Sequence, residues 1–400
     1  MRTLFAWRNS REVAKLAGAF ALLQALVLMF FIAGTHGWIF SDVKPNTVDY
    51  AAFYAAGALA DAGQPEAAYD YRALQAAEER ATEPGIKHQY FFNPPTYLLI
   101  MAPLARLPYL ASFVLFQAVT LGLWLALGTR VAGGGRAATL ALLAVPSVWW
   151  VLGLGQNAFL SAGLMAAGFL LLPARPVLAG IAFGALCYKP HLGLMIPVAL
   201  LAARQWRALL AAAGTVTALI GMTIACFGVA TWRAFFTTAG QNVSGAIDTG
   251  KVLLAARIDP TGAAQFVGLA AAPARAIWVL ALLGAVVTVA WVWRSGRSET
   301  RGAALAASVA IAAPFALFYD LVMASLAAAW IVRAGRARGF LHGEKAALGL
   351  LVLADLLAAP AVVAKMHLPI GALVAPTLLV LAARRHHRER SVEKLTRSSP

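Results

Sequence analysis

The sequence predicts an all-α polytopic membrane protein, and three observations lead to that fold class. Of its 400 residues, 61% are hydrophobic and only 12% are charged. Soluble domains average about 45–50% apolar and about 25% charged residues, so both values depart in the direction of a membrane protein. The mean hydropathy is +0.73, and the apolar residues fall in long runs separated by short basic segments. This composition excludes a soluble enzyme with a single core, a disordered chain and a coiled coil.

The first apolar run extends from Leu16 to Trp38 and follows a stretch with four basic residues between Arg2 and Lys15. A secretory signal peptide has an apolar region of about 7–15 residues and a small-residue cleavage site. Because this run is longer, we expect it to be retained as the first transmembrane helix.

Eleven further apolar runs follow a long polar stretch and, with the first run, predict about twelve crossings. Several are shorter than the ~20 residues that a perpendicular span needs. The pairs 177–188/190–203 and 302–317/321–333 each form either two short helices or one broken helix. The eleven runs are 110–129, 137–153, 157–172, 177–188, 190–203, 208–228, 275–293, 302–317, 321–333, 346–363 and 368–384.

Loop charge favours twelve crossings with both termini inside. When the loops alternate from an inside N-terminus, the inner segments hold 22 of the 33 Lys and Arg residues and carry a net charge of +17. The outer segments are neutral, and Asp355 within a span completes the chain's net charge of +16. Counting either short pair as one crossing would place segment 204–207 or 333–338 outside, against the positive-inside rule. The basic excess therefore indicates a cytoplasmic membrane face and not a nucleic-acid partner.

We expect one integral membrane domain over residues 1–400. Outside the spans it has a first outer loop at 39–109, a second outer loop at 229–274 and a basic inner tail at 385–400. The two cysteines lie in apolar runs and imply neither a disulfide framework nor a zinc site.

Residues capable of chemistry gather on the predicted outer side, whereas the inner loops are short and almost purely basic. Seven of the eight aspartates lie there, and polar turns interrupt the apolar pattern at four outer helix ends. An outer active site that takes a lipid-borne reactant would produce this asymmetry, whereas a transporter would place its polar residues near the midplane. The turns are residues 155–157, 188–191, 318–320 and 365–367, and the aspartates are Asp42, Asp49, Asp61, Asp70, Asp248, Asp259 and Asp320.

The first outer loop has the clearest local pattern. Residues 49–62 predict an amphipathic helix with aromatic side chains available for the membrane interface, ended by Gly63-Gln64-Pro65. Residues 73–80 predict a second short helix, and Tyr90–Pro95 predicts a rigid aromatic turn. Residues 96–104 are too short to span and are expected to be re-entrant.

An ordered set of short motifs covers roughly residues 45–210. The set comprises D-x-x-x-F-Y-x-A-x-x-L from Asp49, G-x-x-x-x-x-Y-D from Gly63, Y-x-x-N-P-P from Tyr90, P-L-x-x-L-P from Pro103, Gly155-Gln156-Asn157, Tyr188-Lys189-Pro190-His191 and R-x-W-R-A from Arg204. In the order and spacing of these motifs, the sequence resembles the membrane glycosyltransferases of family 87 (the DUF2029 group), within the GT-C class. The later helices match only as apolar runs.

The resemblance implies transfer of a hexose, commonly mannose, from a polyprenyl-phosphate carrier to a glycan or lipid acceptor, with inversion at the anomeric carbon. It implies a multi-pass protein of the bacterial inner membrane with a catalytic aspartate in the first outer loop and a periplasmic active site. Donor, acceptor and membrane lipids are then the partners, with no nucleotide sugar and no nucleic acid. No cofactor is expected, because the sequence has no His/Glu cluster with metal-ligand spacing, although some GT-C enzymes use a divalent cation.

Asp49 is the candidate catalytic base, because sugar transfer needs a group that takes the proton of the acceptor hydroxyl. It lies shortly after the first helix leaves the membrane and is followed by aromatic residues. Partial desolvation there would raise the pKa of the carboxyl group toward a useful value. The alternative interpretation is an N-cap for the helix that begins at Tyr50, and the two roles are compatible.

Lys189 is the candidate for holding the departing phosphate. It lies between two apolar segments, where burying an ammonium costs at least ~2.5 kcal/mol unless it is paired or hydrated. Pro190 fits the first turn of the following helix, whose N-terminus also attracts an anion. His191 is a second candidate donor to the phosphate. Alternatively, Lys189 extends its ammonium to the membrane interface, and His191 is a structural residue at that interface.

The remaining substrate-binding candidates are polar residues of the outer segments. Amide side chains in the 155–157 turn suit contacts with sugar hydroxyls, although such a turn is also ordinary. Asp70 alternatively caps a helix, and Arg257 alternatively is a solvated loop charge. The candidates are Tyr54, Asp70, Asn93, Gln156, Asn157 and Arg257.

Two other aspartates have open roles. Asp320, between two apolar runs, is either a second acid, a metal ligand or a helix-end residue. Asp355, within a span, should be paired, protonated or functional, and the sequence names no partner for it.

Two other function classes stay open at this point. A polytopic transporter or lipid-linked-sugar flippase predicts charged pairs at mid-depth related by an inverted repeat, and the sequence has one mid-span charge and no clear repeat. A non-catalytic scaffold of an envelope complex would tolerate the loss of both Asp49 and Lys189.

Overall fold

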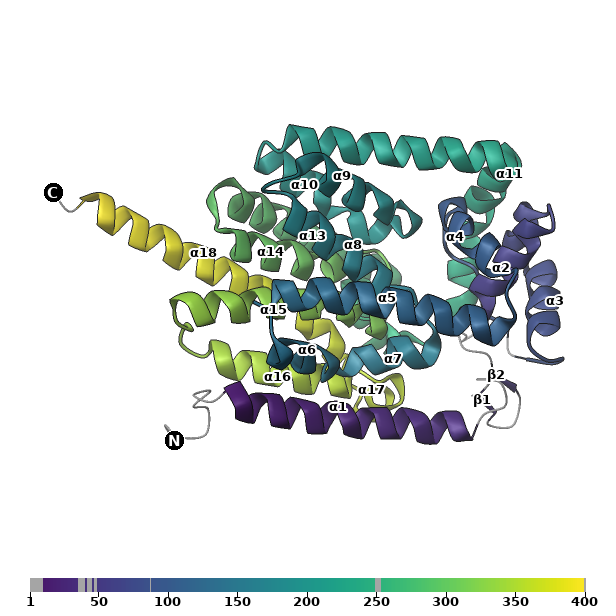
Figure 1. Ribbon diagram of the computed structural model, residues 1–400, viewed down its shortest axis with the longest axis horizontal. Coiled ribbons are helices and arrows are strands. Elements are labelled where there is room, and N and C mark those ends of the chain that lie inside the picture. The colour runs from purple at the N-terminus through teal and green to yellow at the C-terminus, as the bar shows by residue number, and fades with distance from the viewer. Residues whose placement is uncertain are drawn as a thin grey trace.

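Helices form along almost the whole described chain, because each apolar run of the sequence folds into at least one helix (Figure 1). The computed structural model describes residues 10–34, 40–41, 45–46, 49–86, 88–248 and 253–398, so Asp42 of the predicted outer aspartates lies outside the description. The all-α class is confirmed. Strand structure in the described residues is limited to one antiparallel pair, β1 (Phe40–Ser41) and β2 (Pro45–Asn46).

Within the part of the chain that the structure describes, five helical segments are long and apolar enough to cross a membrane. One of them, α11, changes direction at Gly228, where the backbone leaves helical geometry with a φ of 77°. The segments are α1 (Ser10–Ala33), α5 (Tyr109–Val131), the Trp206–Thr238 part of α11 (Trp206–Asp248), α13 (Ala271–Ser295), and the 3₁₀ helix η6 (Phe318–Asp320) continued by α15 (Leu321–Arg338).

Two broken segments raise the number of candidate spans to seven. In each, a short break separates two helices: α6 (Arg136–Leu143) bends by 63° into α7 (Pro146–Leu154), and α16 (Glu344–Leu357) bends by 100° into α17 (Pro360–Met366). Proline at the first turn of each second helix explains why the chain restarts there.

The other apolar runs form shorter helices or, in the last case, a helix with a charged second half. Because of these lengths, the count of twelve crossings and their orientation stay predictions. The elements are α8 (Ala158–Leu171), α9 (Pro176–Gly184) with η3 (Ala185–Tyr188), η4 (Pro190–Gly193) with α10 (Met195–Ala202), α14 (Ser298–Ala312), and η7 (Ile370–Leu373) with α18 (Val374–Ser398).

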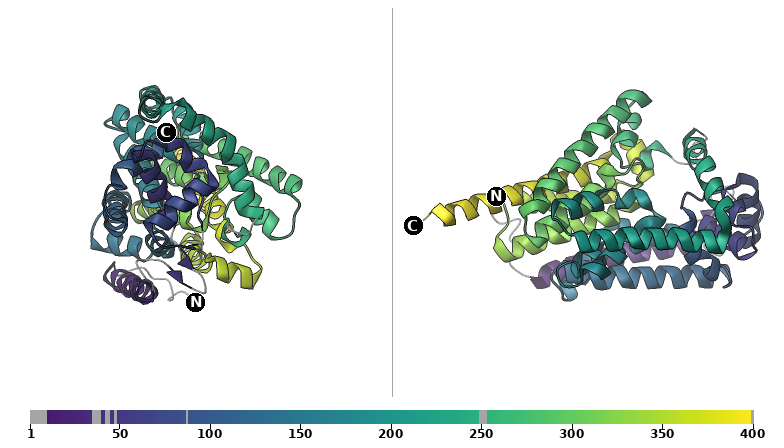
Figure 2. Two further views of the ribbon diagram at one scale, coloured as in Figure 1. Left: turned by 90° about the vertical axis from the view of Figure 1, so that its right-hand side faces the viewer. Right: turned by 90° about the horizontal axis from the view of Figure 1, so that it is seen from above.

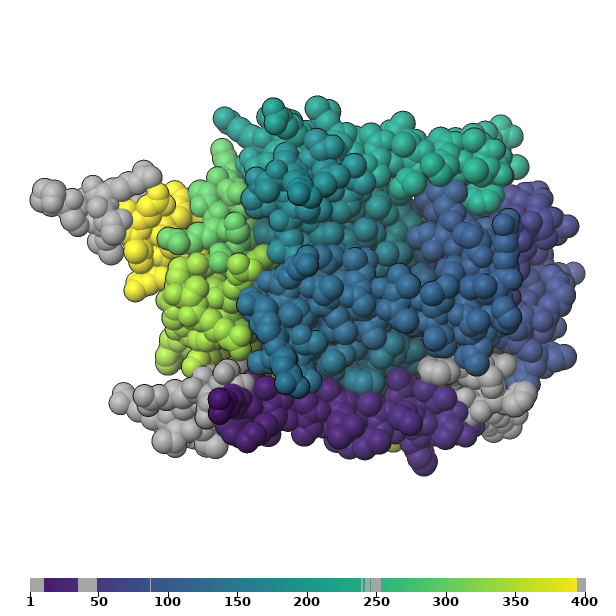
Figure 3. All heavy atoms as spheres, in the orientation of Figure 1, coloured from purple at the N-terminus to yellow at the C-terminus, as the bar shows by residue number. Residues whose placement is uncertain are grey.

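The bundle is centred on α14 and α15, which are almost entirely buried, whereas α1 lies along one flank with its apolar side chains exposed (Figure 3). Gly302 lets the two central helices pack closely, since a Cβ atom there would lie 2.4 Å from Nε1 of Trp330. The two ends of the bundle differ: α18 projects from one end, and the segment after α1 gathers at the other (Figures 1 and 2).

That segment forms a small helical layer. Its central helix, α2, is buried along most of its length, including Tyr50 and Phe53, so its predicted interfacial position is wrong. The reason is that the backbone around Met101 packs against the alanine-rich surface of α2. A Cβ atom on Gly57 would lie 2.3 Å from the Met101 carbonyl oxygen. The layer contains α2 (Tyr50–Asp61), η1 (Pro65–Tyr69), α3 (Tyr71–Ala81), η2 (Pro95–Tyr97) and α4 (Leu98–Leu104).

The second predicted outer loop, 229–274, begins with the last part of α11 and ends with the start of α13, and two short helices lie between them, η5 (Leu254–Ala256) and α12 (Pro260–Phe266). Asp259 caps α12 by accepting a hydrogen bond from the Gly262 backbone at 2.9 Å. Its other carboxylate oxygen accepts one from the backbone of Ala316 at 3.2 Å, so this loop is attached to the segment that precedes η6.

Asp355 has a partner that the sequence did not reveal. Its carboxylate accepts hydrogen bonds from the backbone N–H of Ser147 at 3.2 Å and from the Ser147 hydroxyl at 3.0 Å. Ser147 lies in the first turn of α7, where backbone N–H groups lack partners within the helix. Asp355 therefore supplies a hydrogen-bond acceptor at the break between α6 and α7, although it lies in a helix more than 200 residues later in the chain.

Two glycines spaced four residues apart bring α9 against α11. A Cβ atom on Gly180 would lie 2.3 Å from the Ala208 carbonyl oxygen, and one on Gly184 would lie 2.6 Å from that of Ala212. Small residues at this spacing allow helix backbones to approach closely where apolar burial alone gives little driving force. This contact fixes α9, whose end leads into the η3–η4 break.

We expect Gly180→Ala to destabilise the protein by about 1–3 kcal/mol, because the added methyl group overpacks the α9–α11 contact. Thermal unfolding in detergent measures the change. Gly214→Ala is the matched control, since a Cβ atom there meets nothing within 4 Å. Equal melting temperatures for the two variants would contradict the proposed contact.

Candidate active site

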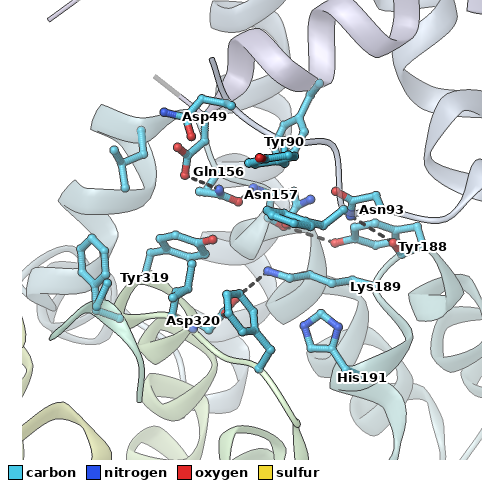
Figure 4. Close-up of a pocket in the computed structure, with 18 of the residues that line it drawn as sticks. Asp49, Tyr90, Asn93, Gln156, Asn157, Tyr188, Lys189, His191, Tyr319 and Asp320 are labelled. Carbon is cyan, nitrogen blue, oxygen red and sulfur yellow. Dashed lines mark hydrogen bonds and ion pairs between the residues drawn. The ribbon is translucent and has the colours of Figure 1, made fainter. Parts of the chain in front are cut away.

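A cavity of about 270 Å³ opens where three helix breaks meet (Figure 4). The breaks are the turn after α7, the η3–η4 junction and the segment between α14 and η6, and the start of α2 closes a fourth side. Carboxylate, amide, ammonium, imidazole and phenol groups therefore share one space inside an apolar bundle. The polar lining residues are Asp49, Gln89, Tyr90, Asn93, Gln156, Asn157, Tyr188, Lys189, His191, Tyr319 and Asp320.

Asp49 lines the cavity with its carboxylate. It occupies the N-cap position of α2, but its side chain makes no capping hydrogen bond. Instead, its Oδ2 accepts a hydrogen bond from Nε2 of Gln156 at 2.5 Å. Asp49 therefore precedes the helix without capping it through its side chain, and its carboxylate is directed toward the cavity.

The neighbours of Asp49 hold both the helix start and the amide in place. Tyr50 is fully buried and its hydroxyl lies 2.7 Å from Oγ of Ser112, and burial raises the pKa of this phenol. Gly155 has a φ of 70°, and a Cβ atom there would lie 2.6 Å from both the Phe113 ring and Cβ of Tyr50. Glycine is therefore required at the turn that brings Gln156 next to Asp49.

Lys189 projects into the cavity from the η3–η4 junction and forms a buried ion pair. Its Nζ lies 2.7 Å from Oδ1 of Asp320, and both side chains are at most one-tenth exposed. Oδ2 of Asp320 accepts a hydrogen bond from the Leu317 backbone at 3.1 Å, which orients the carboxylate. The ammonium also lies 5.4 Å from the centre of the Tyr319 ring, within the range of a cation–π contact.

Hydrogen bonds between uncharged groups connect the residues around Lys189. The Asn93 amide donates to the Tyr188 carbonyl oxygen at 3.1 Å, and the Tyr69 hydroxyl donates to the Asn93 carbonyl oxygen at 2.9 Å. The Tyr188 hydroxyl lies 2.5 Å from Oγ of Ser161 and donates to the Asn157 carbonyl oxygen at 3.2 Å. These bonds connect the aromatic turn, α8 and the η3–η4 break, so the walls form one unit.

Aromatic rings cover the sides of the cavity. They come from the 90–92 turn and from residues 315–319, and Phe92 lies 6.3 Å from Phe315 between ring centres. Figure 4 shows the Tyr319 hydroxyl and the Lys189 ammonium both pointing into the open space. Apolar and aromatic walls with a limited number of placed polar groups are typical of sites that bind small molecules.

Six of the nine predicted site residues line this cavity, and three do not. The Tyr54 hydroxyl donates to the Leu107 carbonyl oxygen at 2.8 Å. Asp70 caps α3 by accepting from the Ala73 backbone at 2.8 Å. Arg257 is buried and donates to both carboxylate oxygens of Asp259, at 3.0 and 2.7 Å. These four hydrogen bonds stabilise the layer and loop around the cavity.

The cavity also contains residues outside the predicted set, and two of them adjoin the Lys189 ammonium. Tyr319 and Asp320 belong to the polar turn at 318–320, which the sequence marks as an interruption of an apolar run. The turn alone did not reveal that Asp320 pairs with Lys189, because 131 residues separate the two in the chain. Among the described residues, no group of three or more His, Cys, Asp and Glu side chains is arranged to hold a metal ion.

The sequence model of the family described as glycosyltransferase family 87 matches residues 91–319, which is more than half of the chain. The protein therefore belongs to this family, and its activity is that of a glycosyltransferase. The matched region contains Asn93, Gln156, Lys189 and His191, and it begins after Asp49. No curated protein and no solved structure gives a significant match to the chain.

We expect Lys189→Met to lower the free energy of unfolding by about 3–5 kcal/mol, because it leaves the buried Asp320 carboxylate unpaired. The double variant Lys189→Met/Asp320→Leu removes both charges and should be more stable than either single variant. Thermal or detergent-induced unfolding of the purified proteins tests this coupling. Additive losses in the double variant would show that the two charges do not stabilise each other.

Proposed function

We propose that the protein transfers a hexose, with mannose as the first candidate, from a polyprenyl-phosphate donor to a glycan or lipid acceptor. The observation that carries this proposal is the placement of the Asp49 carboxylate and the Lys189 ammonium in a single aromatic cavity within a membrane protein of family 87. A lipid-phosphate donor suits a site at the end of an apolar bundle, since its chain stays in the bilayer while its sugar enters the cavity.

In the proposed reaction, the acceptor hydroxyl attacks the anomeric carbon of the donor sugar. The bond between that carbon and the phosphate oxygen breaks, a new glycosidic bond forms on the opposite face, and the configuration inverts. Asp49 takes the proton of the hydroxyl as general base. Its contact with Gln156 supports this role, because one carboxylate oxygen is held by the amide and the group is aimed at the cavity.

Lys189 is proposed to stabilise the departing phosphate, with His191 as a second donor. An ammonium that is already desolvated and held in place stabilises developing negative charge more strongly than one in water. Asp320 keeps Lys189 in position before the donor arrives, and the donor phosphate then competes for or shares the same ammonium. Gln156, Asn157 and Asn93 are proposed to contact the sugar hydroxyls.

We further propose that the cavity faces the periplasmic side of a bacterial inner membrane and that the fold belongs to the GT-C class. Loop charge supports this orientation, because the segments at the opposite end of the bundle carry the basic excess. A polyprenyl-phosphate donor is consistent with it, since such a donor reaches the site through the membrane and needs no soluble nucleotide sugar.

Asp49→Asn should lower the rate of sugar transfer by about 10²- to 10⁴-fold, because the amide cannot accept the hydroxyl proton. The assay supplies purified polyprenyl-phosphate mannose to membranes of a deletion strain that expresses each variant, and mass spectrometry follows the product. The matched control is Asp61→Asn at the other end of α2, where the carboxylate forms a surface ion pair with Arg106 at 2.7 Å. Full activity of the Asp49 variant would refute the base assignment, and transfer from a nucleotide sugar alone by purified protein would refute the donor.

A further inference from the structure

A second cavity lies at the far end of α15 from the candidate active site. The helix begins directly after Asp320 and ends at Arg338, where the second cavity opens. Its 18 residues correspond to about 27 Å, close to the ~30 Å thickness of the hydrocarbon core of a bilayer. If the first cavity lies near one membrane surface, the second therefore lies near the other.

This second cavity, of about 630 Å³, is strongly basic. Its walls come from the end of α13, the turn after α15 and the charged half of α18. Five arginines line it against two glutamates, and its volume falls within the range of small-molecule sites. The charged lining residues are Arg297, Arg338, Arg385, Arg388, Arg390, Glu389 and Glu393.

Two of the arginines have acidic partners within the protein. Arg385 is buried and forms an ion pair with Glu344, a residue outside the cavity lining. Arg338 lies 3.2 Å from Glu299 and 3.6 Å from Glu389. The Glu389 carboxylate also accepts a hydrogen bond from the Thr300 hydroxyl at 2.9 Å, so its charge is already engaged by the protein.

The other three arginines, Arg297, Arg388 and Arg390, are exposed, and no described carboxylate forms an ion pair with them. The charge of Arg390 acts on its neighbour His386: burial lowers the pKa of this imidazole, and the positive charge of Arg390 lowers it further. Three guanidinium groups therefore line one cavity without an ion-pair partner among the described residues.

We propose that this cavity binds the phosphate group of an anionic phospholipid from the membrane leaflet opposite the active site. Guanidinium groups match phosphate in geometry and bind it through paired hydrogen bonds. Apolar side chains, Phe340, Leu341 and Val392, line the same cavity and fit the glycerol and upper acyl region of a lipid. Basic pockets between membrane helices on the cytoplasmic side are known to take such headgroups.

The test uses the full-length protein and is independent of sugar transfer. Native mass spectrometry in detergent compares the binding of phosphatidylglycerol, phosphatidylcholine and inorganic phosphate. Wild type should bind phosphatidylglycerol in preference to phosphatidylcholine. The triple variant Arg297→Gln/Arg388→Gln/Arg390→Gln should bind phosphatidylglycerol about tenfold or more weakly, because each lost charge near an anionic lipid contributes to the attraction.

The matched control removes three exposed arginines outside the cavity: Arg136→Gln/Arg175→Gln/Arg207→Gln. It should keep wild-type binding, and a triple Arg→Lys variant at the cavity should keep part of it. Equal binding by the cavity and control variants would overturn the proposal. Binding of inorganic phosphate without selectivity for phosphatidylglycerol over phosphatidylcholine would overturn the lipid as its source.

Discussion

The constraint on which the structure depends is that a break in an apolar helix leaves backbone polar groups without partners in a medium that offers no water. At several breaks in this bundle, a carboxylate from the same turn or from elsewhere in the chain accepts hydrogen bonds from these backbone groups. Asp355 meets the start of α7, Asp259 caps α12 and reaches Ala316, and Asp320 accepts from the Leu317 backbone. Each of these carboxylates therefore has a structural role, because it accepts hydrogen bonds from backbone N–H groups.

The candidate active site follows from the clustering of such breaks at one end of the bundle. Turns after α7, between η3 and η4 and before η6 all open on the same cavity, so their side chains face one another. Asp320 illustrates the overlap of structure and chemistry: one of its oxygens holds a backbone amide while the other holds Lys189. The carboxylate that accepts a hydrogen bond from the backbone at this break therefore also positions the Lys189 ammonium.

Much of the fold could be predicted from local pattern, because apolar runs and proline or glycine breaks depend only on neighbouring residues. The position of α2 could not, since its burial depends on the contact of Gly57 with Met101 across the layer. In the site, polar turns in the sequence pointed to Gln156 and Lys189, and both residues line the cavity. The roles of Asp70 and Arg257 depended on bonds to Ala73 and Asp259 that residue type alone leaves open. Long-range partners such as Ser147 for Asp355 carry no sequence signal.

The central claim is that one cavity holds the donor phosphate at Lys189 and presents the sugar to Asp49. A structure of the protein bound to a non-cleavable polyprenyl-phosphonate analogue of the donor tests it most directly. We predict the phosphonate within ion-pair distance, about 4 Å, of the Lys189 ammonium, with the sugar between Lys189 and Asp49. A phosphonate bound outside this cavity, or a sugar turned away from Asp49, would contradict the account.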